Sequence, residues 1–240
     1  MTAGKVTIKP PSEDVLRARD NFADFCTAMG KPPAKHMLEW HNQLCTGKDT
    51  ECLMSIGGPN TAILAPRGSA KSTVLGLFAA WMIGRHAAAK KMLRILYIAY
   101  MVDISRAKSA TIKGILTSSK YREIFPMVRL SKIKRSDEYW STDYDFARID
   151  TAGEEAFTVA CGGLKGAITS KRSQLVLIDD PIKSAASINN PDIRREMEQT
   201  WSNVIAPTMF QGARAICLGT RFHFDDIHAT LFIPKNNWKQ

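Results

Sequence analysis

The sequence has few cysteines, no long apolar run and fewer acidic than basic residues, and each shortage excludes a class of protein. Its five cysteines include no Cys-x-x-Cys pair, so the spacing indicates neither a disulfide framework nor a structural zinc site. The longest apolar stretch, residues 92–102, contains Arg94 and is too short to cross a bilayer. Charged side chains interrupt residues 1–25 and leave no apolar centre for a secretory signal. We therefore expect reduced thiols and no membrane role.

Basic residues outnumber acidic ones by 33 to 23, which gives the 240-residue chain a net charge of +10 and a pI near 9.5. This sign of charge favours a polyanionic partner, although a merely soluble basic surface has the same composition. The apolar fraction of 45% is that of a globular protein with one substantial core. We expect one domain with an amino-terminal extension.

One stretch combines a glycine-containing loop, a lysine and a hydroxyl side chain. Apolar residues 61–64 predict a strand and residues 74–83 predict a helix, so the stretch connects a strand to a helix. Backbone N–H groups and the helix amino terminus bind phosphate in such a loop. Lys71 would reach the β- and γ-phosphates of ATP, and Ser72 would bind Mg²⁺. The stretch consists of Ala65, Pro66, Arg67, Gly68, Ser69, Ala70, Lys71, Ser72 and Thr73.

Two positions depart from the G-x-x-x-x-G-K-[ST] pattern of a phosphate-binding P-loop. Ala65 and Ala70 stand where glycine is usual. Alanine preserves the close approach of phosphate if these positions do not need a positive φ. The alternative interpretation is a loop in which Ser69 only caps the helix and Lys71 has no ligand.

A second apolar run ends in paired carboxylates. Residues 175–178 predict a strand at the centre of a sheet, and Asp179 and Asp180 follow it. Like charges at the end of a buried strand need a ligand or partners. In a P-loop enzyme Asp179 would hold Mg²⁺ and Asp180 would orient the attacking water. Alternatively, these residues cap a helix that begins at Pro181.

Polar residues also follow the apolar run at 215–218. Ligands bind at the carboxyl ends of strands in open α/β sheets, so Thr220 and Arg221 are candidates for sensing the γ-phosphate. His223 is interpreted equally well as a turn residue. Residues 93–100 predict a further core strand, because their apolar run is continuous.

Segments before and between these motifs supply weaker candidates. Helices are predicted over residues 13–29 and 35–45. The second helix carries Trp40 and Gln43, which either pack in the core or flank an adenine ring. Two other segments, the glycine-rich residues 162–166 and the basic residues 132–135, can contact phosphates or be plain solvated connections.

Three of these segments together resemble the ATPase domain of the large terminase subunit, the DNA-packaging motor of tailed bacteriophages. They are residues 65–73, residues 175–183 and residues 218–227. The last segment, Leu-Gly-Thr-Arg-Phe-His-Phe-Asp-Asp-Ile, resembles the coupling motif of that family. The resemblance spans most of the chain and depends on the combination rather than on any single motif.

The resemblance implies an α/β fold, a P-loop NTPase of the additional-strand (ASCE) type with a mainly parallel central sheet flanked by helices. An additional strand would lie between the strands that carry Lys71 and Asp179, and residues 93–100 are our candidate for it. Residues 1–60 would form an N-terminal helical extension with a possible adenine-site segment. Residues 61–240 would form the ATPase core, without the nuclease domain of the family.

The resemblance also implies roles for single residues. Lys71 and Ser72 would bind phosphate and metal, and Asp179 would be the metal-binding carboxylate. Asp180 would be the catalytic carboxylate, although the family more often has the longer glutamate there. Thr220 would couple the state of the γ-phosphate to DNA movement.

Further implied roles concern cationic and aromatic residues. Arg67 matches a family arginine that senses nucleotide. Lys165 and Arg172 both qualify as the group that acts in trans on a neighbouring subunit, and the sequence does not choose between them. Trp40 and Gln43 lie before the P-loop, where the family has its adenine motif.

We therefore expect an ATPase that uses ATP and Mg²⁺ and translocates double-stranded DNA, without nuclease activity. The expected partners are the portal protein, the small terminase subunit and further copies in a ring, a pentamer when assembled and a monomer in isolation. The expected location is the host cell cytoplasm. The alternatives are a helicase-like ATPase fragment and a nucleic-acid-binding module whose P-loop does not hydrolyse ATP, because Ala65 and Ala70 replace glycines.

Overall fold

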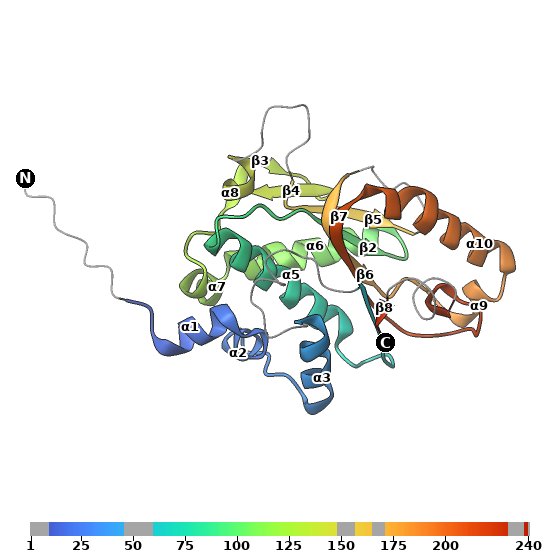
Figure 1. Ribbon diagram of the computed structural model, residues 1–240, viewed down its shortest axis with the longest axis horizontal. Helices are drawn as coiled ribbons and strands as arrows, with labels where there is room; N and C mark the ends of the chain where they lie inside the picture. Colours follow the sequence, from blue (N-terminus) through green and yellow to red (C-terminus); the bar gives the residue numbers. More distant parts are fainter. Residues whose placement is uncertain (1–9, 46–59, 148–156, 165–170, 230–237, 240) are drawn as a thin grey trace, which may run out of the picture.

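The computed structural model describes residues 10–45, 60–147, 157–164, 171–229 and 238–239. In this part of the chain a mostly parallel sheet of eight strands lies between two layers of helices (Figure 1), so the expected α/β class is confirmed. The helices are α1 (Glu13–Asp20), α2 (Phe22–Ala28), α3 (Lys35–Leu44), α5 (Lys71–Ala88), α6 (Val102–Thr117), α7 (Ser119–Ile124), α8 (Asp143–Phe146), α9 (Ala185–Ile188) and α10 (Pro191–Thr200). The strands are β1 (Asn60–Leu64), β2 (Ile95–Ala99), β3 (Leu130–Arg135), β4 (Tyr139–Thr142), β5 (Val159–Gly163), β6 (Ser173–Asp179), β7 (Met209–Gly219) and β8 (Trp238–Lys239).

The strands lie in the order β3-β4-β5-β2-β6-β7-β1-β8. All neighbours from β5 to β8 are parallel, whereas β3 and β4 form an antiparallel addition at one edge. Residues 93–100 contain β2 as expected, but the strand between β1 and β6 is β7. Our candidate for the inserted strand was therefore wrong. A continuous apolar run predicts a buried strand, but the neighbours of that strand depend on how the whole sheet packs.

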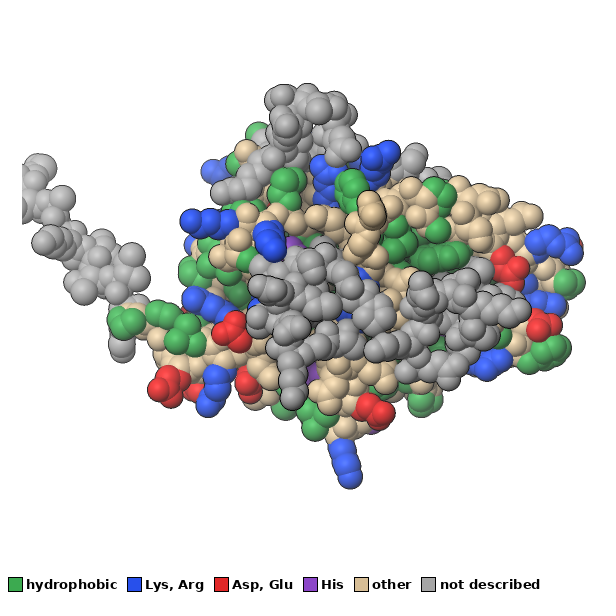
Figure 2. Space-filling model, viewed as in Figure 1, with side chains coloured by type: hydrophobic (Ala, Val, Ile, Leu, Met, Phe, Trp, Pro, Cys, Tyr) green, Lys and Arg blue, Asp and Glu red, His purple; other side chains and the backbone are tan. Residues whose placement is uncertain are grey.

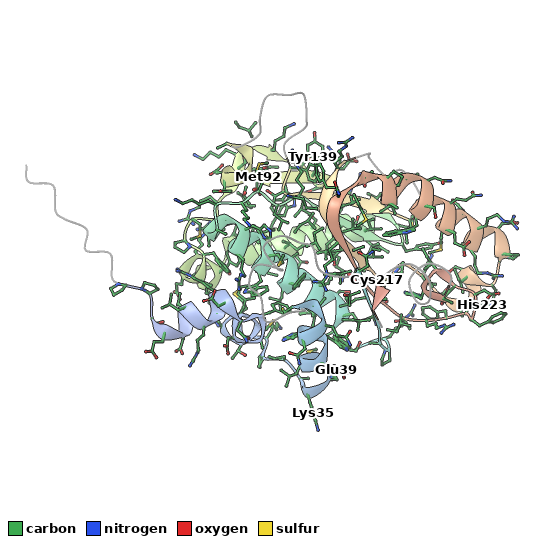
Figure 3. All side chains as sticks on the ribbon, in the orientation of Figure 1. Lys35, Glu39, Met92, Tyr139, Cys217 and His223 are labelled. Atoms are coloured by element: carbon green, nitrogen blue, oxygen red, sulfur yellow. The ribbon has the colours of Figure 1, made fainter. Side chains whose placement is uncertain are left out.

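The two faces of the sheet have separate cores because successive side chains of a strand point in opposite directions. Leu177 of β6 and Ile216 of β7 pack with the helix α5 on one face. Ile178 and Cys217, the next residue of each strand, pack on the other face with residues of α10 and the turn after it. Cys217 lies near the centre of the molecule in Figure 3. The sheet is thus buried on both sides, which suits its continuous apolar strands.

The amino-terminal helices differ from the single helix predicted over residues 13–29. Asn21 has an extended backbone with φ −121° and ψ 125°, and its side chain accepts a hydrogen bond from the backbone N–H of Asp24. Asparagine is among the preferred residues at a helix start, so it ends α1 and begins α2. Phe22 and Phe25 of α2 belong to the same core as α5. The predicted helix over 35–45 is present as α3, and Lys35 projects outward from its first turn (Figure 3).

The glycine-rich segment predicted as a loop over 162–166 is partly strand. Gly162 and Gly163 belong to β5 and pair with Ile98 and Ala99 of β2. A Cβ atom at Gly163 would lie 2.7 Å from the backbone nitrogen of Val102, so the close approach of β5 to the start of α6 requires glycine. Local composition does not reveal such a contact. No helix in the described part of the chain is long and apolar enough to cross a membrane.

Candidate functional site

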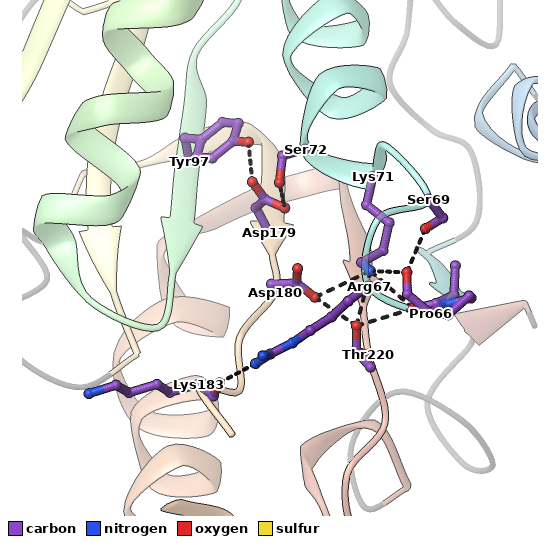
Figure 4. A network of polar contacts seen from close by, with 11 residues as sticks. Pro66, Arg67, Ser69, Lys71, Ser72, Tyr97, Asp179, Asp180, Lys183 and Thr220 are labelled. Atoms are coloured by element: carbon purple, nitrogen blue, oxygen red, sulfur yellow. Dashed lines mark hydrogen bonds and ion pairs between the residues drawn. The ribbon is translucent and has the colours of Figure 1, made fainter. Parts of the chain in front are cut away.

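Parallel pairing brings three polar segments to one edge of the sheet. Leu64, the last residue of β1, pairs with Gly219 at the end of β7, and Asp179 at the end of β6 pairs with Leu218. The loop of residues 65–70 therefore lies beside the residues that follow β6 and β7 (Figure 4). The structure brings together the three motifs that the sequence analysis selected from distant parts of the chain.

The loop between β1 and α5 contains two residues with a left-handed backbone. Gly68 has φ 82°, and Ala70 has φ 61° and ψ 23°. Ala70 thus occupies a position that needs a positive φ, which glycine adopts freely and alanine does not. Ala70 is also the N-cap of α5, and no side chain caps the helix. The Ser69 hydroxyl donates instead to the carbonyl of Pro66 at 2.7 Å, so the alternative with Ser69 as the cap is wrong.

Lys71 is buried at the start of α5, and its ammonium group is bonded to the loop itself. The Nζ atom donates to the carbonyl oxygens of Ala65 at 3.0 Å and Pro66 at 2.8 Å. It also donates to the hydroxyl of Thr220 at 3.0 Å and lies 3.8 Å from the carboxylate of Asp180. An ammonium has three N–H donors, so these three acceptors use them all. The positive charge therefore lies inside the loop, where a phosphate would meet it.

Asp179 is a buried carboxylate that is bonded through both oxygens. Oδ1 accepts from the Ser72 hydroxyl at 2.9 Å, and Oδ2 accepts from the Tyr97 hydroxyl at 2.9 Å (Figure 4). Burial raises the pKa of Asp179, and the hydrogen bonds from Ser72 and Tyr97 reduce that rise. The sequence analysis did not select Tyr97, because an aromatic residue within an apolar strand is usually a core residue.

The pair formed by Ser72 and Asp179 suits magnesium. Both supply hard oxygen ligands, and they lie in contact at the site where the loop would hold phosphate oxygens. Magnesium usually binds through one or two protein oxygens together with phosphates and waters. Within the described residues there is no cluster of three or more His, Cys, Asp or Glu side chains that could hold a metal. Ser72 and Asp179, whose oxygens lie 2.9 Å apart, are the candidate residues for holding such an ion.

Asp180 and Thr220 complete the group around Lys71. Asp180 has φ 41°, a left-handed conformation that is rare outside glycine. The Thr220 hydroxyl lies 3.1 Å from the carbonyl oxygen of Ala65 and 3.3 Å from Oδ1 of Asp180. Its single proton is donated to one of these acceptors at a time. The side chain of Asp180 is 41% exposed, so water reaches this carboxylate.

Arg67 points across the site instead of into the loop. Its guanidinium donates to the carbonyl oxygen of Lys183 at 2.6 Å and lies 5.1 Å from the ring centroid of Phe222. The exposed arginine thus connects the P-loop-like segment to the residues that follow β6 and β7.

A cavity of about 370 Å³ opens beside the end of β1. It brings together Trp40 and Gln43 of α3 with Arg221. Arg221 does not reach Lys71, since its guanidinium donates to the carbonyl oxygens of His223 at 3.4 Å and Phe224 at 3.0 Å. The cavity is lined by Glu39, Trp40, Gln43, Ala62, Ile63, Leu64 and Arg221.

Arg214 of β7 fixes α3 beside this cavity and was missed in the sequence. Its buried guanidinium donates to the carbonyl oxygens of Leu44 at 2.6 Å and Gln43 at 3.0 Å, and to the hydroxyl of Thr61 at 2.9 Å. The last carbonyls of a helix lack partners within the helix, and a cation satisfies them. In the sequence, Arg214 is marked by its position directly before the apolar run at 215–218.

The segment after Thr220 is built around the buried carboxylate of Asp226. It accepts from the backbone N–H groups of Phe222 at 3.0 Å and His223 at 3.2 Å. Burial would raise the pKa of Asp226, but its hydrogen bonds with His228, Phe222 and His223 outweigh this effect and lower the pKa to about 2. His223 accepts at Nδ1 from the backbone N–H of Asp225 at 3.0 Å, which supports its interpretation as a turn residue.

Of the two candidates for a group that acts in trans, Arg172 is not near this edge. Arg172 directly precedes β6, so it lies at the opposite edge of the sheet from Asp179. Lys165 lies outside the described residues. The basic residues 132–135 form most of the edge strand β3, in which Lys132 and Arg135 are exposed. Lysines on edge strands also prevent pairing with other chains. The basic side chains of β3 therefore have a structural explanation, and we assign no ligand to them.

A scan of the chain against protein-family models gives no match, and a search among curated proteins gives none either.

Proposed function

We propose that the chain is an ATP-hydrolysing motor domain of the large terminase type, which moves double-stranded DNA. The observation that carries the proposal is the contact at 2.9 Å between Ser72 and Asp179, with Lys71 beside it. A lysine and a hydroxyl at the start of a helix, facing a carboxylate on a neighbouring strand end, is the arrangement that binds a magnesium–nucleotide complex. The order of β1, β7 and β6 supports a P-loop fold of the additional-strand type.

Lys71 and the first turn of α5 bind the phosphates in this mechanism. An entering phosphate replaces the carbonyl oxygens of Ala65 and Pro66 as the acceptor for Lys71. The backbone N–H groups at the start of α5 add further donors, since no side chain caps this helix. Ser72 and Asp179 would hold magnesium, which would neutralise charge on the phosphates.

Asp180 accepts the proton of the attacking water. Its carboxylate is accessible to solvent and lies 3.8 Å from Lys71, so it is near the γ-phosphate end of the site. The water oxygen forms a bond to the γ-phosphorus, and the bond to the leaving ADP oxygen breaks. Thr220 contacts both Lys71 and the loop carbonyl of Ala65. Loss of the γ-phosphate therefore changes the hydrogen bonds of Thr220. This residue directly precedes the segment that is built around Asp226.

Two further features support the adenine site and the DNA partner. Trp40 and Gln43 line the cavity beside β1, the strand that leads into the loop, which supports them as candidates for the adenine site. The net charge of +10 favours binding to DNA phosphates, which suits a motor that must ignore sequence. Basic side chains are spread over the described part of the face in Figure 2 rather than gathered in one patch. A ring on a portal protein, with the small subunit as a further partner, is the assembly that this function requires.

Phosphate release from ATP by the purified chain tests the proposal. Lys71→Ala should lose nucleotide binding and turnover together. Asp180→Asn should keep nucleotide binding and lose turnover by about 100-fold or more, the usual contribution of a general base. Lys91→Ala and Asp14→Asn are matched controls, because both residues are exposed and lie away from the site. Both controls should hydrolyse ATP at the wild-type rate.

The outcomes separate the alternatives. Equal and slow phosphate release by wild type, Lys71→Ala and Asp180→Asn would refute an ATPase. A wild-type chain that binds ATP without turnover would instead support the non-hydrolysing module, for which the left-handed Ala70 is the structural argument.

A further inference from the structure

Tyr97 reaches the site from the interior of the sheet. It lies on β2 and is completely buried in the core that packs against α5. In the register of β2 and β6 it pairs with Leu177, which is two residues before Asp179 and therefore on the same face. The ring thus extends along β6 toward the strand end, and its hydroxyl donates to Oδ2 of Asp179 at 2.9 Å.

Each oxygen of Asp179 is consequently held by a different element. Ser72 of α5 bonds Oδ1 and Tyr97 of β2 bonds Oδ2 (Figure 4). Rotation about the terminal bond of the carboxylate moves both oxygens, so it breaks one hydrogen bond when a single oxygen is held and two when both are held. Tyr97 therefore keeps Oδ1 directed at Ser72.

Packing alone does not explain the hydroxyl of Tyr97. A phenylalanine would fill the same core position, and a buried tyrosine can satisfy its hydroxyl with any nearby acceptor. Tyr121 does this, since it is equally buried and donates to the backbone carbonyl of Ala80 at 2.9 Å. The two tyrosines differ in the group that accepts their hydrogen bond, a carboxylate for Tyr97 and a backbone carbonyl for Tyr121. Tyr121 is therefore the matched comparison.

We propose that Tyr97 is a positioning residue for the metal-binding carboxylate of Asp179. This inference rests on the proposed function. Without the hydroxyl, Oδ2 of Asp179 is left buried without this hydrogen bond, and the carboxylate turns away from the position that serves the metal. Replacing a residue that orients a metal ligand typically changes the metal affinity by about 10–100-fold. Tyr97 should therefore determine the magnesium requirement of the site.

The test compares Tyr97→Phe and Tyr121→Phe with the wild-type chain. Magnesium is titrated against binding of a fluorescent, non-hydrolysable ATP analogue, and thermal unfolding is measured without metal or nucleotide. We expect Tyr97→Phe to need about tenfold more Mg²⁺ for half-saturation. Tyr121→Phe should lower thermal stability to a similar extent and keep the wild-type Mg²⁺ requirement.

A wild-type Mg²⁺ requirement in folded Tyr97→Phe would overturn the positioning role while leaving the ATPase proposal intact. An equal shift in Tyr121→Phe would also overturn it, because general loosening of the core would then explain both. If the wild-type chain binds the analogue without any need for Mg²⁺, the proposed function and this inference both fail.

A second measurement applies if Tyr97→Phe does not fold. The wild-type chain is labelled with 3-fluorotyrosine, and single Tyr→Phe variants at the other four tyrosines identify the fluorine resonance of Tyr97 by elimination. This resonance should shift when Mg²⁺ is added to the complex with the ATP analogue. An unchanged resonance would overturn the proposal. The other tyrosines are Tyr100, Tyr121, Tyr139 and Tyr144.

Discussion

Replacing Ala70 by glycine should stabilise the protein, although glycine usually weakens the interior of a helix. Ala70 has φ 61° and ψ 23°, a conformation that costs a residue with a Cβ about 1–2 kcal/mol. Glycine removes that strain but loses about 0.4–1 kcal/mol through the greater freedom of the unfolded chain. The free energy of unfolding should therefore rise by about 1 kcal/mol, which corresponds to about 2–4 °C in Tm for a chain of this size. Denaturant and thermal unfolding measure both quantities.

The matched control for this prediction is Ala110→Gly. Ala110 is exposed in the interior of α6, where the helical backbone suits alanine. The same substitution should there lower the free energy of unfolding by about 1 kcal/mol. The reasoning is refuted if Ala70→Gly destabilises the protein as Ala110→Gly does, because the backbone at position 70 would then not be left-handed in solution.

The remaining predictions concern acid stability and DNA. Asp226 has its pKa lowered from 3.8 to about 2, so it contributes about 2 kcal/mol of stability that is present above about pH 4 and lost as the pH falls toward 2. Asp226→Asn should have a lower free energy of unfolding than wild type near neutral pH, and it should lose less of that free energy as the pH falls toward 2. An equal pH dependence of the free energy of unfolding in both proteins would contradict the argument. Binding to duplex DNA should weaken steeply with salt and depend little on sequence, as measured by fluorescence anisotropy on unrelated duplexes, and sequence-selective binding would argue against a phosphate-gripping motor.

The sequence predicted most of the central sheet because buried parallel strands have continuous apolar runs. The run at 175–178 marks β6, and the polar residues that follow each run mark the edge where Asp179 and Thr220 meet. The strand order could not be predicted in the same way. Residues 93–100 and residues 215–218 have equivalent apolar runs, and only long-range packing places the second beside β1.

The supporting residues of the site were also hidden in the sequence. Tyr97 lies within an apolar run and Arg214 at the start of another, so neither differs from an ordinary core or strand residue until its partner is known. Asn21 carried a usable signal, since asparagine often starts a helix, but the apolar spacing on both sides suggested one continuous helix. Backbone strain at Ala70 has no signal at all in a residue that favours helices.

The bonding of Lys71 determines how the empty protein behaves. Because Ala65, Pro66 and Thr220 already satisfy its ammonium group, the chain can fold and persist without a bound anion, and no uncompensated charge is trapped in the loop. An incoming phosphate, as the proposed function requires, would exchange hydrogen bonds rather than add new ones, so the net gain in binding would be smaller than the number of contacts implies. Under the proposed function, this smaller gain would ease release of the phosphate after each turnover.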